Sequence, residues 1–316
     1  MKRPGLAFWA GCAVAIGLAI AAVALIRNEY YFFAGYVVLM FVVLATAWNI
    51  LGGYAGYVNF GTAAFFGVGA YTAAVLFKST GAPLAVQILA AAAVSGLLGF
   101  GTGLLTLRLR GIFFAIATVA VIFIMETLFI NWRYAGGATG LQLLRPAPIW
   151  PFASYTTMLF VVMASMAVGA VAVARYIETS WIGRGLRAIR DSEEAAECSS
   201  VPTLKLKLFA CTVSGALMGA AGACMPMYLS FIEPASTFNL NYAIGALASP
   251  MIGGMTHYIG PVIGAIVLST IQQVVTVTIS GEMNVMVVGV LLVVFVVAAP
   301  EGILGLFKRW KKPSSR

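Results

Sequence analysis

Residues 31–51 read YFFAGYVVLMFVVLATAWNIL, an apolar run that contains no Asp, Glu, Lys or Arg. A helix rises 1.5 Å per residue, so a run of this length crosses the roughly 30 Å hydrocarbon core of a bilayer. Nine more apolar segments flank it, at residues 6–26, 60–77, 83–107, 112–131, 152–174, 206–229, 242–256, 262–280 and 285–306. We therefore predict an all-α, polytopic transmembrane bundle of about ten hydrophobic segments, eight to ten of them full spans. Residues 1–316 are expected to form a single membrane domain.

The composition agrees with a membrane protein and excludes several other classes. Hydrophobic residues make up 61% of the chain and charged residues 9%, against roughly 25% charged in soluble domains. The 34 glycines are scattered through apolar runs, which excludes collagen and disordered linkers. The strands of a membrane β-barrel alternate apolar and polar residues, and these runs do not. The first run is longer than the apolar core of a signal peptide, so we expect it to be a retained span.

The placement of basic residues predicts the topology. With the N-terminus inside, 15 of the 19 Lys and Arg residues fall on one side, many of them in the segment 175–207 and the tail 307–316. The positive-inside rule then places both termini, this segment and the tail in the cytoplasm. We attribute the net charge of +9 to topology and contact with membrane lipid, not to nucleic-acid binding.

Two glycine clusters interrupt the spans. The first includes Gly52, Gly53, Gly56, Gly61, Gly67 and Gly69, and the second Gly253, Gly254, Gly260, Pro261 and Gly264. Glycine permits close helix packing, and broken helices at membrane depth are tolerated where they line a cavity or are covered by protein. Both readings, tight packing and a role in a solute pathway, remain open. The candidate pathway or gate residues are Gly61, Gly67, Gly69, Glu126, Gly253, Gly254, Gly260 and Pro261.

The longest hydrophilic segment, residues 175–207, predicts a short cytoplasmic coupling helix over about 192–200. Asp191 precedes Glu194 by three residues, as in a capping box, and Pro202 closes the segment. We expect a docking surface for a cytosolic protein, with a solvated helix as the alternative. The candidate docking residues are Arg184, Arg187, Arg190, Asp191, Glu193, Glu194, Ala195, Ala196 and Ser200.

Several motifs in this order resemble one family, the inner-membrane permeases of branched-chain amino acid ABC transporters, and specifically their LivM-type subunit. Glu194-Ala195-Ala196 resembles the EAA loop through which such permeases dock their ATPase, although Ser200 stands where a glycine is usual. Further similarities are GTAAFFGVGAY at 61–71, LRLRGIFFAIAT at 107–118, the glycines at 136, 137, 140, 253, 254, 260 and 264, and PEGI at 300–303. The chain departs from the family's outer T-G-G-x-N-G segment at Ala135 and Thr139.

The resemblance implies partners that composition alone does not show. They are a second, LivH-like permease subunit, two cytosolic ATP-binding subunits and an extracytoplasmic substrate-binding protein, at a bacterial inner membrane. The chain has no G-x-x-x-x-G-K-[ST] loop, which is the phosphate-binding signature. We therefore expect no cofactor on this chain, with ATP and Mg²⁺ bound by the partner ATPases, and no enzymatic activity of its own.

Few polar residues fall inside the predicted spans. Glu126 is the one acid well inside a span, and intramembrane carboxylates are functional candidates by default. A helix-to-helix hydrogen bond or a place in the solute path would each explain it. We expect His257 to be a satisfied loop residue and Asn49 and Asn59 to serve turns or caps. The four cysteines and single histidine support neither a disulfide framework nor a zinc site.

Two other function classes compete with an ABC permease. A stand-alone secondary transporter would normally need several intramembrane acids or histidines for ion coupling. A membrane enzyme would need a nucleophile with its base or a metal cluster. Neither set is present in the sequence. The solute is expected to be a branched-chain or related hydrophobic amino acid, but the residues suit an aromatic acid, an amide or urea equally.

Overall fold

The computed structural model describes residues 6–25, 28–109, 111–144, 154–278, 283–298 and 302–305. Its long helices are α1 (Leu6–Leu25), α2 (Glu29–Ala55), α3 (Thr62–Thr80), α4 (Leu84–Thr106), α5 (Ile112–Asn131), α6 (Tyr155–Thr179), α9 (Thr203–Gly222), α12 (Leu240–Gly253), α13 (Ile259–Thr278) and α14 (Met283–Ala298). The short helices are η1 (Arg133–Ala135), η2 (Gly137–Thr139), α7 (Trp181–Asp191), α8 (Glu193–Cys198), α10 (Met225–Leu229) and α11 (Pro234–Thr237). Strands β1 (Leu141–Gln142) and β2 (Phe231–Ile232) pair antiparallel.

Each of the ten predicted apolar segments overlaps one of the long helices, which confirms the all-α, polytopic class. Six helical stretches of the described residues are long and apolar enough to cross a membrane: Glu29–Ala55, Leu84–Thr106, Ile112–Asn131, Tyr155–Thr179, Thr203–Leu229 and Ile259–Thr278. Phe8–Val23 and Met286–Phe295 are shorter apolar helices. Helices α3 and α12, from the two shortest predicted segments, are not among the six. The count of ten spans and the N-in, C-in orientation remain predictions.

Several of the Lys and Arg residues that we counted to predict the topology lie outside the described residues. Lys2, Arg3, Arg27, Arg110 and Arg145 lie outside the described residues, as do the tail 307–316 and Pro300 and Glu301 of the PEGI motif. The PEGI glycine, Gly302, is described and is buried.

Helix α2 lies at the centre of the bundle and packs against α6, α9, α12 and α13. It begins at Asn28, whose side chain caps the Tyr30 amide, and ends at Gly56 in the left-handed conformation (φ 78°), where glycine has no Cβ penalty. Its second half is buried throughout. Trp48, 2% exposed, donates its indole N–H to the Asn59 carbonyl at 2.6 Å. An apolar helix that is buried on all sides is expected at the core of a bundle.

Helices α3, α4 and α9 pack closely through small residues. A Cβ at Gly69 would collide with Gly219 of α9, and one at Gly99 would lie 2.8 Å from the Cys211 carbonyl oxygen. Ser95 donates its hydroxyl to the Phe65 carbonyl across the α3–α4 contact at 2.9 Å. Small side chains and inter-helix hydrogen bonds are the forces that hold helices together in lipid.

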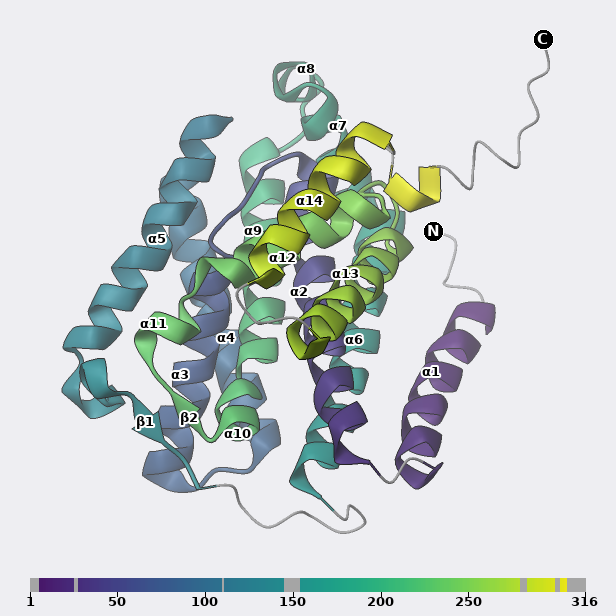
Figure 1. The fold of residues 1–316 in the computed structure, drawn as a ribbon. Helices are drawn as coiled ribbons and strands as arrows, with labels where there is room; N and C mark the ends of the chain where they lie inside the picture. The colour runs from purple at the N-terminus through teal and green to yellow at the C-terminus, as the bar shows by residue number, and fades with distance from the viewer. Residues whose placement is uncertain are drawn as a thin grey trace.

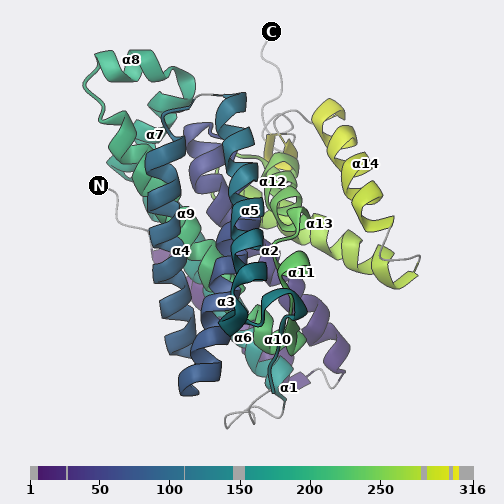
Figure 2. The ribbon, with the colours of Figure 1, turned by 90° about the vertical axis from the view of Figure 1, so that its left-hand side faces the viewer.

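The two ends of the bundle differ. Helices α7 and α8 project from one end, while β1, β2 and α10 lie toward the other (Figure 1). Helices α13 and α14 extend from the bundle on the side away from α4 (Figure 2). The charged α7–α8 segment therefore lies at one end of the membrane helices.

Candidate functional site

The predicted coupling helix is present but shorter than expected. It is α8, Glu193–Cys198, and the preceding eleven residues form a separate helix, α7. The prediction that Asp191 caps the coupling helix is wrong, because Asp191 is the last residue of α7 and its carboxylate lies 3.6 Å from Arg190 Nε. Ser192 takes the cap instead, and its hydroxyl accepts a hydrogen bond from the Ala195 amide at 3.3 Å. Glu193 and Glu194 fill the first turn, where the helix dipole favours acids.

The exposed face of the α7–α8 segment is narrower than the sequence indicated. Arg184, Glu194, Ala195 and Ser200 are exposed, but Ala196 is only 4% exposed and packs into the chain's own core. Two adjacent helical positions differ by about 100° in direction, so both alanines cannot face one partner. Ala195 is therefore the small residue that α8 presents at its surface.

A buried ion pair holds α8 to the membrane helices. Lys207 of α9 lies 2.5 Å from Glu193 Oε1, and the two side chains are only 4% and 15% exposed. Lys207 Nζ also donates to the Tyr57 hydroxyl at 3.1 Å and to the Leu107 carbonyl at 3.3 Å. Tyr57 donates its hydroxyl to Glu193 Oε2 at 2.5 Å. We call these three side chains, Glu193, Lys207 and Tyr57, the clamp; it joins α8 to α9, to the α2–α3 connection and to the end of α4.

Arginines of α7 bind backbone of the membrane helices. Arg190 Nη1 donates to the Gly53 carbonyl at the end of α2, 3.2 Å away, and Arg187 Nη2 donates to the Glu178 carbonyl at the end of α6, 3.3 Å away. Both were predicted as docking residues. Their guanidinium groups fasten α7 to the ends of α2 and α6. Arg184 and Arg190 are both exposed, whereas Arg187 is partly buried.

The turn between α12 and α13 lies at the same end and is bonded to α2 and α6. Asn49 of α2 donates its side-chain amide to the Met255 carbonyl at 3.1 Å. The carboxylate of Glu178 accepts the Tyr258 amide at 2.7 Å and the Tyr54 hydroxyl at 3.3 Å. Asn49 therefore serves a contact between distant segments, not the local turn or cap that we expected, whereas Asn59 does serve a turn by accepting the Gly61 amide at 2.8 Å.

The second glycine cluster forms this turn, residues 254–258, together with the crossing of α12 and α13. Gly254 has φ 115°, a conformation that side chains with a Cβ rarely adopt. A Cβ at Gly253 would collide with the Gly260 carbonyl, one at Gly260 with the Gly254 carbonyl, and one at Gly302 would lie 2.5 Å from the Gly254 amide. Pro261 is buried in the first turn of α13, where a proline costs no hydrogen bond.

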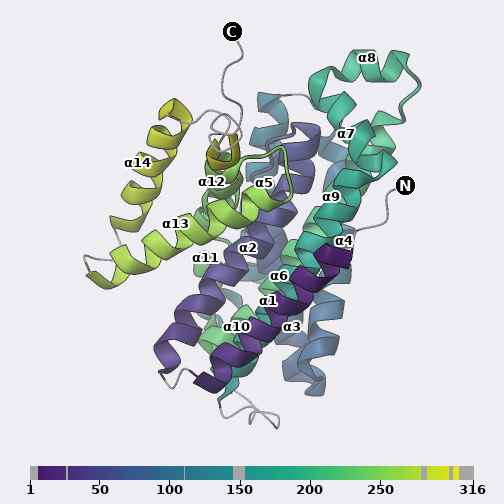
Figure 3. The same cartoon turned by 90° about the vertical axis from the view of Figure 1, so that its right-hand side faces the viewer.

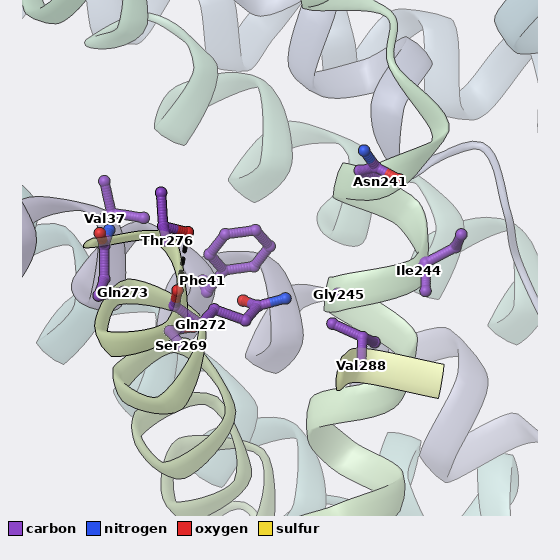
Figure 4. A pocket seen from close by; sticks show the side chains of 10 residues that line it. All are labelled: Val37, Phe41, Asn241, Ile244, Gly245, Ser269, Gln272, Gln273, Thr276 and Val288. Carbon is purple, nitrogen blue, oxygen red and sulfur yellow. Dashed lines mark hydrogen bonds between the residues drawn. The ribbon is translucent and has the colours of Figure 1, made fainter. Parts of the chain in front are cut away.

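A polar cavity of about 260 Å³ lies between α2, α12, α13 and α14. Gln272 extends from α13 into the space beside α12 (Figure 4). Ser269, Gln272, Gln273 and Thr276 share one face of α13, because their spacing of three, four and seven residues matches the helical repeat. The Ser269 hydroxyl is buried and has no hydrogen-bond partner among the described residues. Val37, Phe41, Ile244 and Val288 supply the apolar side of the cavity.

Comparison with known proteins adds the family. A family model for the permease component of branched-chain amino acid transport systems matches residues 30–296. The chain belongs to this family.

The relatives of this permease fall into more than one solute class. It is 25% identical over 291 residues to the high-affinity branched-chain amino acid permease protein LivM of Salmonella typhimurium, covering 84% of this chain and 68% of that protein. It is 28% identical over 137 residues to a probable LivH of Methanocaldococcus jannaschii, covering 41% and 42%. It is 29% identical over 147 residues to the ribose import permease RbsC of Haemophilus influenzae, covering 44% and 40%. No solved structure shows a significant match.

The first glycine cluster of this permease makes packing contacts. A Cβ at Gly67 would collide with the Phe238 ring and one at Gly69 with Gly219, while one at Gly61 would lie 3.0 Å from Asn59 Oδ1. These three glycines are buried and do not line the polar cavity. Their role in the solute path remains a prediction without a contact that favours it.

Glu126 lies apart from the polar cavity. It is partly buried on α5, a helix at one side of the bundle, and does not line that cavity. Among the described residues it makes no ion pair with Lys or Arg. Its two candidate roles, bonding between helices and solute passage, both stay predictions.

Sequence reasoning missed two features of the permease. Lys207 was counted only as a topology charge, since its pairing with Glu193, fourteen residues away, depends on the angle between α8 and α9. The polar stripe on α13 was visible in the sequence as Ser269, Gln272, Gln273 and Thr276 at helical spacing within an apolar segment. That pattern is the signal by which it could have been found.

Proposed function

We propose that this chain is the LivM-type permease subunit of a binding-protein-dependent ABC importer. It forms half of the translocation pathway for branched-chain or related hydrophobic amino acids. ATP and Mg²⁺ act on two separate cytosolic ATP-binding subunits, and this chain carries no cofactor. The observation that carries the proposal is a pair of hydrogen bonds that link α7 to the end of α2, and α2 to the glycine turn. The turn continues directly into α13, which carries the polar face.

Helix α8 is the proposed docking element for one ATPase. Its exposed Ala195 lets a partner surface approach closely, and the exposed Glu194 and Arg184 would set the orientation of that partner. The helix does not stand free, because the clamp and the buried Ala196 fix it to the bundle. A displacement of the ATPase would therefore move α8 together with α9 and the end of α2.

Two hydrogen bonds at the end of α2 extend this connection to the pathway. Arg190 of α7 binds the Gly53 carbonyl, and Asn49, one helical turn earlier, binds the Met255 carbonyl in the glycine turn. The turn leads directly into α13. We propose that ATP-driven movement of α7 and α8 reaches the polar face of α13 by this route. Coupling of this kind requires an element with two arrangements, and the Gly254 turn is our candidate for it.

The polar cavity is the proposed site where solute passes. Its amide and hydroxyl groups suit the charged backbone groups of an amino acid, and Val37, Phe41 and Ile244 suit an apolar side chain. A second, LivH-like permease subunit would complete the pathway on the open side of α13 and α14. The similarity to a ribose permease makes a sugar the solute to test against amino acids.

The proposed orientation places α7 and α8 in the bacterial cytoplasm with both termini, and the ten apolar segments in the inner membrane. Helix α1 begins toward the α8 end of the bundle (Figure 3), in agreement with an N-in topology. The end with β1 and β2 would then face the extracytoplasmic substrate-binding protein.

Co-purification of the ATP-binding subunits tests the docking surface. We expect Ala195→Arg, which places a bulky charge on the exposed face of α8, to lower the recovered ATPase about tenfold or more, because a central contact residue dominates binding energy. Ala235→Arg is the matched control, since Ala235 is also exposed but lies in α11. Unchanged ATPase recovery with Ala195→Arg would refute the docking role of α8.

Uptake assays with the complete set of subunits test the solute. Leucine, isoleucine, valine, phenylalanine and ribose should be compared at equal concentration. Uptake of ribose but none of the amino acids would refute the proposed solute class and leave the docking proposal standing.

A further inference from the structure

A second, apolar cavity opens between α1 and the bundle. It has a volume of about 770 Å³ and is walled by α1, α2, α6 and α13. Figure 3 shows α1 lying along α6 on this side of the molecule, with α13 beside them. Among the side chains that line it, Arg175 alone is charged. We call this cavity the α1 groove.

Small residues on α1 leave the groove open. Gly11, Ala15, Ala19 and Ala22 all line it, and their spacing of three to four residues places them on one face of the helix. A Cβ at Gly11 would meet no atom within 4 Å. In a membrane the hydrocarbon chains of lipid can enter such a space, because they are as apolar as the side chains that line it.

Arg175 lies at one end of the groove, against two aromatic rings. Its guanidinium lies 4.0 Å from the centroid of the Phe8 ring and 5.3 Å from that of Tyr258. Its one hydrogen bond within the described chain goes to the Tyr258 hydroxyl at 3.3 Å. No carboxylate among the described residues lies within ion-pairing distance of it. A guanidinium has five N–H donors, so most of its donors are available to a ligand.

The position of the charge matches the geometry of a phospholipid. Arg175 is near the end of α6, six residues before the first residue of α7, the helix that leads away from the bundle. The apolar part of the groove runs from there along α1, toward the middle of the membrane. The charge therefore lies at the membrane surface and the apolar wall lies in the hydrocarbon region. Basic pockets between membrane helices on the cytoplasmic side recognise anionic lipid head groups.

We infer that the α1 groove is a binding site for one anionic phospholipid, with an acyl chain between α1 and α6 and its phosphate bound by Arg175. The inference rests on the membrane location of the chain and not on the proposed transport function. Phe8 and Tyr258 hold the guanidinium in place by cation–π contact, and the lipid would fasten α1 to the rest of the bundle.

Native mass spectrometry of the purified full chain tests this site. Dioleoyl phosphatidylglycerol and dioleoyl phosphatidylcholine share their acyl chains and differ in net charge, so their ratio in the bound state reports the head-group contact. We expect the wild type to prefer phosphatidylglycerol and Arg175→Gln to lower that preference about tenfold, as for loss of a hydrogen bond to a charged group. Arg175→Lys should keep part of the preference, and Arg133→Gln, an exposed arginine outside the groove, should keep all of it.

Filling the groove tests the acyl chain. Gly11→Leu should lower the occupancy of both lipids, whereas Gly17→Leu should not, because Gly17 is also free of contacts but does not line the groove. Soluble glycerol 1-phosphate, which carries the anion without a chain, should not displace the lipid. Equal binding of the two lipids by the wild type, full occupancy in Gly11→Leu, or displacement by glycerol 1-phosphate would each overturn the inference. This experiment measures lipid binding and does not depend on solute uptake, so its result can be interpreted even if the transport proposal fails.

Discussion

Replacing Lys207 with methionine should release α8 from the bundle. Methionine keeps the length and apolar stem of the lysine but removes the ammonium group, which contacts Glu193, Tyr57 and the Leu107 carbonyl. Glu193 would then be a carboxylate with 15% side-chain exposure that has lost the Lys207 ammonium group. We expect α8 to be the element that unfolds or detaches, because a helix of six residues is too short to be stable on its own.

The size of the effect follows from the burial of the pair. Breaking a buried ion pair by removing one partner costs about 3–5 kcal/mol. Glu193 lies at the edge of the protein and can turn toward water, so we take the lower end, about 3 kcal/mol. Each 1.4 kcal/mol is a factor of ten, so the population with α8 released should rise by roughly a hundredfold.

Hydrogen–deuterium exchange in lipid nanodiscs measures that release. The amides of residues 195–200 should exchange roughly a hundredfold faster in Lys207→Met, while those of α2 and α6 should not change. Lys205→Met is the matched control, because Lys205 is exposed and lies two residues away. Combining Lys207→Met with Glu193→Gln removes both charges and should restore most of the protection. Protection of α8 equal to that of the wild type in Lys207→Met would refute the clamp.

Three further substitutions test the turns and the polar cavity. Ser200 has φ 61°, a conformation that a β-branched residue tolerates less well than serine, so Ser200→Val should lower the free energy of unfolding in chemical denaturation, whereas Ser200→Gly should not lower it. Gly254→Val should abolish uptake and leave ATPase co-purification unchanged, and loss of both would show that the turn serves only folding. Gln272→Leu should raise the KM for uptake several-fold, measured against Val274→Leu on the same helix but outside the cavity lining; equal KM values would exclude Gln272 from the solute path.

The sequence predicted the membrane helices because a backbone in lipid has few ways to satisfy its hydrogen bonds. Each apolar segment therefore overlaps a helix in the structure. The acids in the first turn correctly predicted a short helix here, but the predicted N-cap residue, Asp191, was wrong and Ser192 is the N-cap. Asp191 and Ser192 both have side chains that cap well, and the choice between them depends on where α7 ends.

Other parts of the site depend on contacts between distant segments. Tyr57 and Lys207 are 150 residues apart and Asn49 and Met255 are 206 apart, and no local pattern brings either pair together. Ala196 resembled Ala195 in sequence, yet it packs inward because Glu193 on the same helix is tied to α9. The glycine turn was predicted as a break in the helices, and the structure adds its hydrogen bond to α2.

Solute accumulation in proteoliposomes tests the central claim most directly. Vesicles would contain this chain and its second permease subunit, with the binding protein outside, and would be prepared with or without the ATP-binding subunits and trapped ATP. The account predicts accumulation of at least one hydrophobic amino acid only when both the ATP-binding subunits and ATP are present. Accumulation that persists without them, driven by a proton or sodium gradient, would contradict it and make the chain a secondary transporter.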